Sequence, residues 1–240
     1  GTVAADERAQ SVVTLRFKAH IMKLHVASTG ERVRIGQPLF DVHSPFLLQE
    51  EVTLALDLRA RDVSEKLGGV YARSNASAAA IARKRLELYE IPDAEIARLI
   101  RTGEPSGRVT WVATHAGTVV EKPVVEGMQV EEGTPLYRIT DLSTVWVIAQ
   151  APEQALSVTR PGAHARISFA AFPGQQFDGK VTFVYPEVSM TTRTVKVRIE
   201  LPNSDGSLLP GMFASAEITS ASQDLAITAP DSAVLASSSS

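Results

Sequence analysis

The hydrophobic positions of the chain follow two different periods along its length. In residues 195–201 apolar residues alternate with charged ones, the period-two pattern of a half-buried strand. Residues 44–107 instead carry apolar stripes at helical spacing. Short strand-like segments occupy the chain on both sides of this helical region. The pattern therefore predicts a mixed α and β fold with a helical insertion between two β-rich parts.

The first expected helix covers residues 45–67. Ser44 and Pro45 supply an N-cap and a first-turn proline, and Gly68 and Gly69 end the helix. At ~1.5 Å per residue such a helix would be roughly 35 Å long. The helix is predicted from an apolar stripe close to the helical period, which consists of Leu48, Val52, Ala55, Leu56, Ala60, Val63 and Leu67.

Two further helices are expected before residue 107. A short third helix should follow Pro92 and end at Gly103. Between it and the first helix lies a stripe that begins with small residues, which allow two helices to approach closely: Ala72, Ala76, Ala79, Ala82, Leu86 and Tyr89. The first two helices are therefore predicted to form a projecting hairpin.

A thirteen-residue motif occurs once on each side of the helical region. GERVRIGQPLFDV at 30–42 returns as GMQVEEGTPLYRI at 127–139, with five identical and two similar positions, each 97 residues after its counterpart. The glycines permit turns with positive φ, and the proline leads into a strand with alternating apolar residues. Neither copy could bury its apolar side alone, so the two copies are expected to close on each other as one split β-sandwich.

The second half of the chain predicts a small antiparallel β-barrel. Its strand-like segments are short and are separated by tight turns, such as the one at Pro161 and Gly162. A short helix is expected from Pro152. The last segment begins something new and breaks off in serines, so no function is assigned to it.

Composition and charge narrow the classes of function. With 44% hydrophobic and 21% charged residues among 240, the chain has a globular composition. A net charge of −3 predicts no nucleic-acid partner, and the absence of cysteine excludes thiolate sites while fitting a periplasmic protein. No nucleophile elbow, phosphate-binding glycine loop or H-E-x-x-H motif is present. We therefore expect a protein that is not an enzyme.

Several segments together carry a family resemblance. They are IMKLHVASTGERVRIGQPLFDVHSP, RKRLELYEIPDAEIARLI, THAGTVVEKPVVEGMQVEEGTPLYRITDLSTVWVIAQAPE, TTRTVKVRIELPN and LLPGMFASAEI. Over nearly its whole length the chain resembles periplasmic adaptors, or membrane fusion proteins, of heavy-metal RND-type tripartite efflux systems of the copper/silver or zinc branch. One departure is His20, which stands ten residues before Gly30 where the family more often has glycine.

The resemblance implies an elongated multidomain fold. Residues 12–43 and 108–140 would be the two halves of a lipoyl-like barrel-sandwich hybrid, and residues 44–107 an inserted α-helical hairpin with a short third helix. Residues 1–11 and 141–223 would form the β-barrel, and residues 224–240 would begin a truncated membrane-proximal domain.

The resemblance also implies an adaptor function in the periplasm of a Gram-negative bacterium, at the inner membrane. The protein would link an inner-membrane proton-driven RND exporter to an outer-membrane channel for heavy-metal cations, and would assemble as a hexameric ring. Docking to the channel is expected at the hairpin tip, where the helices reverse. The tip residues are Lys66, Gly68, Gly69, Tyr71, Arg73 and Asn75.

Metal binding by the chain itself has few candidates. Soft Cu(I) or Ag(I) prefers thioether ligands, whereas Zn(II) prefers imidazole and carboxylate. The four methionines are far apart, and Met190 is interpreted as structural. His20 and Met22 share one face of an expected strand and are the weak candidates for a metal site. No resident cofactor is expected, and weak binding of Cu(I)/Ag(I) or Zn(II) stays open.

Two other functions compete with the adaptor. A lipoyl-like sandwich is also the fold of biotinyl or lipoyl carriers, and Met22-Lys23-Leu24 resembles a biotinylation site. However, Lys23 precedes Gly30, while the place for the modified lysine, after Leu39, reads DVHSPFLL and contains no lysine. The second alternative is a metal-binding periplasmic chaperone.

Overall fold

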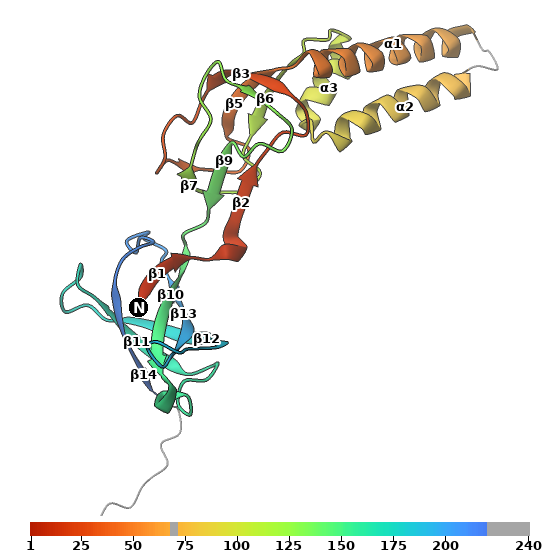
Figure 1. The fold of residues 1–240 in the computed structure, drawn as a ribbon. Coiled ribbons are helices and arrows are strands. Elements are labelled where there is room, and N and C mark those ends of the chain that lie inside the picture. Colours follow the sequence, from red (N-terminus) through yellow and green to blue (C-terminus); the bar gives the residue numbers. More distant parts are fainter. Residues whose placement is uncertain (68–71, 220–240) are drawn as a thin grey trace, which may run out of the picture. The chain divides into compact units, whose positions relative to one another are not determined.

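The computed structural model describes residues 1–67 and 72–219, except for the side chains of residues 66, 67 and 72–76. It divides into two compact units (Figure 1). One unit is Ala5–Leu142, and the other combines Gly1–Ala4 with the described residues from Ser143, that is 143–219. The first unit therefore starts at Ala5, seven residues before the predicted start of the sandwich.

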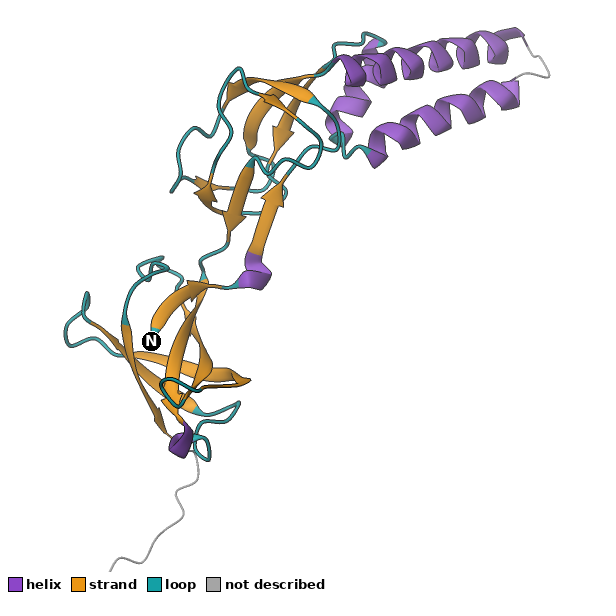
Figure 2. Ribbon diagram, viewed as in Figure 1, coloured by secondary structure: helices purple, strands orange, loops and turns teal. Residues whose placement is uncertain are grey.

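The unit Ala5–Leu142 contains two four-stranded antiparallel sheets and all three α-helices of the described residues (Figure 2). In the first sheet the order is β2 (Gln10–Val13), β9 (Tyr137–Thr140), β7 (Gly117–Glu121), β4 (Arg32–Val33). In the second the order is β6 (Arg108–Val112), β5 (Pro38–His43), β3 (Ala19–Leu24), β8 (Gln129–Val130). A short 3-10 turn, Glu7–Ala9, precedes β2.

Each of these sheets combines strands from both parts of the chain that flank the helices. In the first sheet β4 pairs with β7, and in the second β3 pairs with β8. The two parts of the chain that flank the helices are therefore joined by ladder hydrogen bonds into one sandwich, as the repeat predicted.

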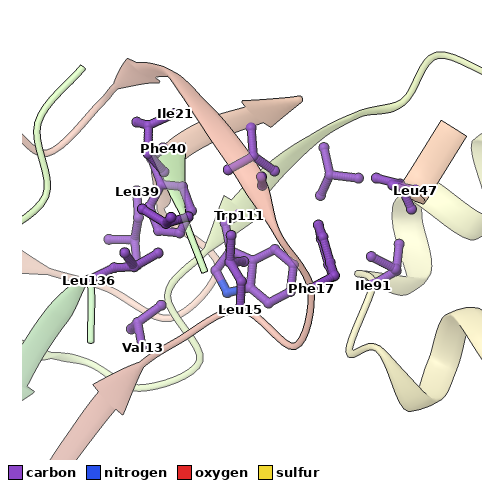
Figure 3. Close-up of a cluster of buried hydrophobic side chains, with 14 of the residues drawn as sticks. Val13, Leu15, Phe17, Ile21, Leu39, Phe40, Leu47, Ile91, Trp111 and Leu136 are labelled. Atoms are coloured by element: carbon purple, nitrogen blue, oxygen red, sulfur yellow. The ribbon is translucent and has the colours of Figure 1, made fainter. Parts of the chain in front are cut away.

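Equivalent residues of the two copies meet in the core of the sandwich. Phe40 and Tyr137 are fully buried, and their rings stack with centroids 5.6 Å apart and planes 3° from parallel. Figure 3 shows Phe40 beside Leu39, Leu136 and Trp111 in this core. The Tyr137 hydroxyl donates to the Val26 carbonyl at 2.7 Å, and burial raises the pKa of this phenol to about 12.

Three helices follow β5 without interruption by further strands. They are α1 (Pro45–Leu67), α2 (Ala72–Leu88) and α3 (Asp93–Thr102), and α1 and α2 lie side by side (Figure 1). Gly103 ends α3 in the left-handed conformation, with φ 64°, and donates its N–H to the Leu99 carbonyl at 2.7 Å. The described helix boundaries agree with those predicted for the first and third helices.

The other unit is built on a six-stranded antiparallel sheet with a buried aliphatic core. Its order is β1 (Thr2–Ala5), β10 (Thr144–Pro152), β13 (Thr194–Pro202), β12 (Phe177–Ser189), β11 (His164–Phe169), β14 (Ala214–Thr219). The apolar positions of β13 are at most 2% exposed, which confirms the period-two prediction there: Val195, Val197, Ile199 and Leu201. After Pro152 only a 3-10 turn, Glu153–Ala155, forms where a short helix was expected.

Candidate partner-contact site on the helix pair

The first turn of α1 is fixed to the sandwich by Ser44. This residue is fully buried, and its hydroxyl donates to the Lys18 carbonyl at 2.7 Å. The same oxygen accepts the Leu47 N–H at 3.4 Å, the position of an N-cap contact. Phe46 follows and packs edge-on against Tyr89 at the end of α2, with ring centroids 4.8 Å apart. Both helices are therefore anchored at their sandwich ends.

A buried carboxylate joins α1 to the chain that returns into β6. Glu51 is 2% exposed, and its Oε2 accepts the backbone N–H groups of Ser106 at 2.6 Å and Gly107 at 2.8 Å. The Arg98 guanidinium of α3 lies 4.0 Å from the other carboxylate oxygen. Burying a charge is costly unless hydrogen bonds and an opposite charge compensate it, and both are supplied here.

Further polar contacts hold the helices to one another. Arg98 donates to the Glu104 carbonyl and to the Ser106 hydroxyl, each at 3.1 Å, which ties α3 to the segment that leads into β6. Arg85 of α2 donates to Glu50 of α1 at 3.1 Å. The three helices are therefore linked to one another and to the sandwich at the base of the pair.

The buried side of α1 differs from the apolar stripe that marks this helix in the sequence. Leu47, Leu54 and Ala55 are at most 5% exposed, whereas Leu56 is 57% exposed and Val63 56% exposed. Of the apolar stripe seen in the sequence, Leu48, Val52, Leu56 and Val63 are exposed and Ala55 is buried. The true stripe passes through Glu51, whose charge breaks the apolar pattern in the sequence although the side chain is buried.

The stripe of small residues that predicted a close approach of the two helices is buried on α2 where its side chains are described. Ala79, Ala82 and Leu86 are at most 5% exposed, and the small alanine side chains allow α1 to approach closely. The outward face of α2 carries Ile81 and Leu88, which are 61% and 64% exposed.

The unexpected exposure leaves an apolar surface on α1, here called the outer stripe. It consists of Leu48, Val52, Leu56 and Val63, which recur at intervals of four, four and seven residues along one side of the helix. Apolar surface arranged in a stripe on a helix is suited to packing against a helix of another chain.

The predicted tip residues cannot be placed as contacts. Gly68, Gly69 and Tyr71 lie outside the described residues, and so do the side chains of Lys66, Arg73 and Asn75. The outer stripe is the feature that sequence reasoning missed. Its residues were recognised as an apolar stripe at helical spacing, but no contact surface was predicted from them.

The candidate metal residues lie on the outward face of β3. His20 and Met22 are both exposed, and His20 stands opposite His43 in the ladder between β3 and β5. Among the described residues no group of three histidine, aspartate or glutamate side chains is arranged to hold a metal ion. Met190, which was interpreted as structural, is 96% exposed, so that interpretation was wrong.

A second polar cluster lies on the same sheet. The Asp41 carboxylate is 3.0 Å from His25 Nε2 and accepts the Thr110 hydroxyl at 2.7 Å. Burial acts to raise the pKa of Asp41, but the hydrogen bonds from His25 and Thr110 outweigh it and hold that pKa below its usual value. Lys23, the candidate for modification in a carrier, is an exposed residue of β3, and β5 runs directly into α1.

The chain is similar to known families over almost all of its described length. Residues 10–140 match the family described as CusB, barrel-sandwich hybrid domain, which is more than half of the 240 residues. The chain belongs to the CusB-like family. Residues 144–222 also match the CusB-like beta-barrel domain. These matches confirm the expected barrel-sandwich hybrid and β-barrel domains, and they confirm the resemblance to membrane fusion proteins of metal efflux systems.

The proteins similar to this chain include a putative membrane fusion protein and a cation efflux system protein. The putative membrane fusion protein SilB of Salmonella typhimurium is 26% identical over 97% of this chain and 51% of its own length. The cation efflux system protein CusB of Escherichia coli K12 is 25% identical over 93% of this chain and 52% of its own length. ZneB of Cupriavidus metallidurans, a solved structure, is 27% identical with a TM-score of 0.55, over 91% of this chain and 69% of that chain. The chain spans about half the length of the curated relatives it matches.

No helix within residues 1–67 and 72–219 is both long and apolar enough to cross a membrane.

Proposed function

We propose that this chain is the sandwich, helix-pair and barrel portion of a non-enzymatic periplasmic adaptor for heavy-metal efflux. The observation that carries the proposal is the membership of the CusB-like family, together with the similarity to SilB and CusB over nearly the whole chain. The adaptor would lie at the inner membrane of a Gram-negative bacterium. It would link an RND exporter there to an outer-membrane channel.

The helix pair is the part of the chain proposed to contact the channel. It is anchored at its base by Ser44 and Glu51, while its outer stripe keeps apolar side chains exposed along α1. Exposed apolar surface of this kind is stabilised when another helix covers it. We propose that the two helices form a hairpin in an elongated protein. Its tip, Lys66 to Asn75, would dock into grooves between helices of the channel.

Self-assembly into a ring is the second proposed use of the helix pair. The outer stripe lies on α1, and Ile81 and Leu88 give α2 an exposed apolar surface of its own. Contacts between different surfaces of identical copies close into rings when the rotation permits it. We propose a hexameric ring on the grounds of the family resemblance.

A complementation experiment tests the adaptor function and the role of the outer stripe. The host strain lacking the gene would be complemented with the full-length protein and scored for growth on zinc, cobalt, copper, silver and a panel of drugs. Wild type should restore growth on at least one metal. Leu56→Glu with Val63→Glu should lose this rescue, because two charges would have to be desolvated in the contact. Ala80→Glu is the control, since it adds charge at an exposed position of α2 and should retain rescue.

Failure of the wild-type protein to change growth on any metal would contradict the efflux proposal. Retained rescue by the double variant, at equal protein levels, would contradict the role of the outer stripe.

The competing functions are separated by two measurements on the purified chain. Intact mass of protein from its native host should show no biotin or lipoate, because Lys23 is an exposed residue of strand β3 and no lysine follows β5 before α1. Calorimetry with Zn(II), Cu(I) and Ag(I) should show only weak binding, for which His20, Met22 and the opposing His43 would be the ligands. Tight stoichiometric binding would favour the metal chaperone.

A further inference from the structure

A cavity of about 390 Å³ opens between the edges of the two sheets in the sandwich. Strand β2 is the last strand of one sheet, β6 is the last strand of the other, and residues of both line the cavity. Its volume falls within the ~300–1,000 Å³ range of small-ligand pockets. It is separate from the helix-pair surface proposed to contact the channel. We call it the seam, and it is lined by Val12, Val13, Thr14, Glu90, Pro92, Trp111, Val112, Thr114 and His115.

The open edge of β2 directs main-chain groups into the seam. The carbonyls of Val13 and Leu15 accept N–H groups from the β9 side, at 2.9 Å from Leu136 and 2.8 Å from Gly133. Because the main-chain groups of successive residues in a strand point to opposite sides, those of Val12 and Thr14 point away from β9. They are the free edge of this sheet.

The edge of β6 does the same from the opposite wall. The Gly107 carbonyl accepts from Ser44 at 2.9 Å, and the Ala113 N–H donates to Gln37 at 2.9 Å, both toward β5 and its approach. Because main-chain direction alternates along a strand, every second residue between Gly107 and Ala113, including Val112, directs its main-chain groups away from β5. Two strand edges that pair with no further strand of the described residues therefore line one cavity.

The floor and rim of the seam define the chemistry of what could bind. Trp111 is 7% exposed, and its indole N–H makes no hydrogen bond within the part of the chain that the structure describes. Val13 is nearly buried beside it, whereas Val12 is 46% exposed. On the rim, Glu90 is paired with Arg16 at 2.6 Å, so its charge is compensated. The walls combine apolar surface with main-chain donors and acceptors and carry no excess charge.

We propose that the seam binds an extended, uncharged and apolar polypeptide segment of a partner protein, which adds as a strand to the edge of β2. Main-chain hydrogen bonds to Val12 and Thr14 would provide the register. Alternate apolar side chains of the segment would cover Trp111, and a carbonyl of the segment would accept the indole N–H. A charged segment is disfavoured, because the seam offers no uncompensated charge to pair with it.

The probes for this proposal are two sets of capped pentapeptides added to the full 240-residue chain. One set has the form acetyl-Thr-X-Thr-X-Thr-amide with X as Val, Ile, Leu or Phe, and the other has X as Asp or Lys. Backbone amide NMR should show shifts concentrated at Val12, Thr14, Val112 and Thr114 for the apolar set. The charged set should bind at least tenfold more weakly.

A proline substitution separates strand addition from simple apolar contact. Val12→Pro removes the outward N–H without removing a ladder hydrogen bond to β9, since proline is tolerated on edge strands in this orientation. It should weaken binding of the apolar peptides about tenfold. The control is Arg32→Pro on β4, the opposite edge of the same sheet, which should leave binding unchanged. Circular dichroism of both variants checks that the fold is retained.

Three outcomes would overturn the proposal. The first is the absence of amide shifts at the seam with every apolar peptide at millimolar concentration. The second is equal binding by the Val12→Pro and Arg32→Pro variants, which would show that no strand is added to β2. The third is self-association of the chain, seen by analytical ultracentrifugation and abolished by Val12→Pro, because the occupant would then be a second copy.

Discussion

Removal of the Glu51 carboxylate should loosen the base of the helix pair. This side chain is 2% exposed and accepts two backbone N–H groups, from Ser106 at 2.6 Å and from Gly107 at 2.8 Å. In Glu51→Ala both donors would lose their acceptor. Each donor left without its acceptor costs about 1–3 kcal/mol, so the two together cost about 2–6 kcal/mol. Relief of the desolvation of the carboxylate offsets part of this cost, so we expect a loss of about 3 kcal/mol in the free energy of unfolding.

Urea denaturation followed by circular dichroism at 222 nm measures this loss of stability in the unit Ala5–Leu142. All α-helices of the described residues belong to Ala5–Leu142, so the helical signal reports the unfolding of that unit. Hydrogen exchange at the amides of Ser106 and Gly107 should accelerate in the same variant, because these amides are the donors to Glu51.

The matched control is the neighbouring residue Glu50. Its partner Arg85 is half-exposed, so Glu50→Ala should cost no more than about 1 kcal/mol. If the two variants lose the same stability within about 0.5 kcal/mol, or if exchange at Ser106 and Gly107 is unchanged, Glu51 does not hold the returning chain and the reasoning is refuted.

Three further predictions rest on other contacts. Gly107 and Gly103 have nearly equal positive φ, 63° and 64°, but a Cβ on Gly107 would lie 2.9 Å from Leu48 Cβ, whereas one on Gly103 would meet nothing within 4 Å. Gly107→Ala should therefore lower the unfolding free energy by about 1–2 kcal/mol more than Gly103→Ala, and equal losses would exclude a steric role. Because the pKa of Asp41 is lowered in the folded state, this carboxylate adds stability at pH values above its usual pKa of 3.8, and that stability is lost as pH falls through the folded-state pKa. In Asp41→Asn the free energy of unfolding should therefore depend less on pH below about pH 4. An unchanged pH dependence in that range would contradict this. The pKa of Tyr137, raised to about 12, favours folding at pH values below the usual 10.0, and this effect is lost as pH rises from there. Absorbance titration at 295 nm should therefore show one tyrosine that ionises at higher pH than the others, and Tyr137→Phe should remove it.

The duplicated motif could be recognised from sequence because each copy is a local unit. Its glycines and prolines act on the backbone at their own positions, and Gly30 and Gly127 have φ of 89° and 79° as expected. Phe40 and Tyr137, which hold equivalent positions in the two motif copies, also have equivalent places in the structure, since both are buried and stack on each other. A difference between the copies is explained only by the fold: a Cβ on Gly117 would lie 2.7 Å from the Thr140 carbonyl, whereas its counterpart His20 is exposed and tolerates a side chain.

The period of apolar residues alone could not predict which side of α1 faces the core. Two stripes offset by one position compete on this helix, and the one with more apolar residues is exposed. The buried stripe includes Glu51, which no hydropathy pattern assigns to an interior. Its burial depends on two N–H groups that lie 55 and 56 residues away in sequence. The seam between β2 and β6 was likewise missed, because it exists only when two sheets are closed upon each other.

The sequence alone therefore determined the elements and the pairing of the two motif halves. Turn residues, capping residues and the period of apolar positions act over a few neighbours, and the duplicated pattern requires each half to find the other. The tertiary structure decided which faces are covered, which carboxylate is compensated and which strand edges stay open. These depend on groups far apart along the chain, because burial and hydrogen-bond satisfaction are properties of the packed whole and not of any local segment.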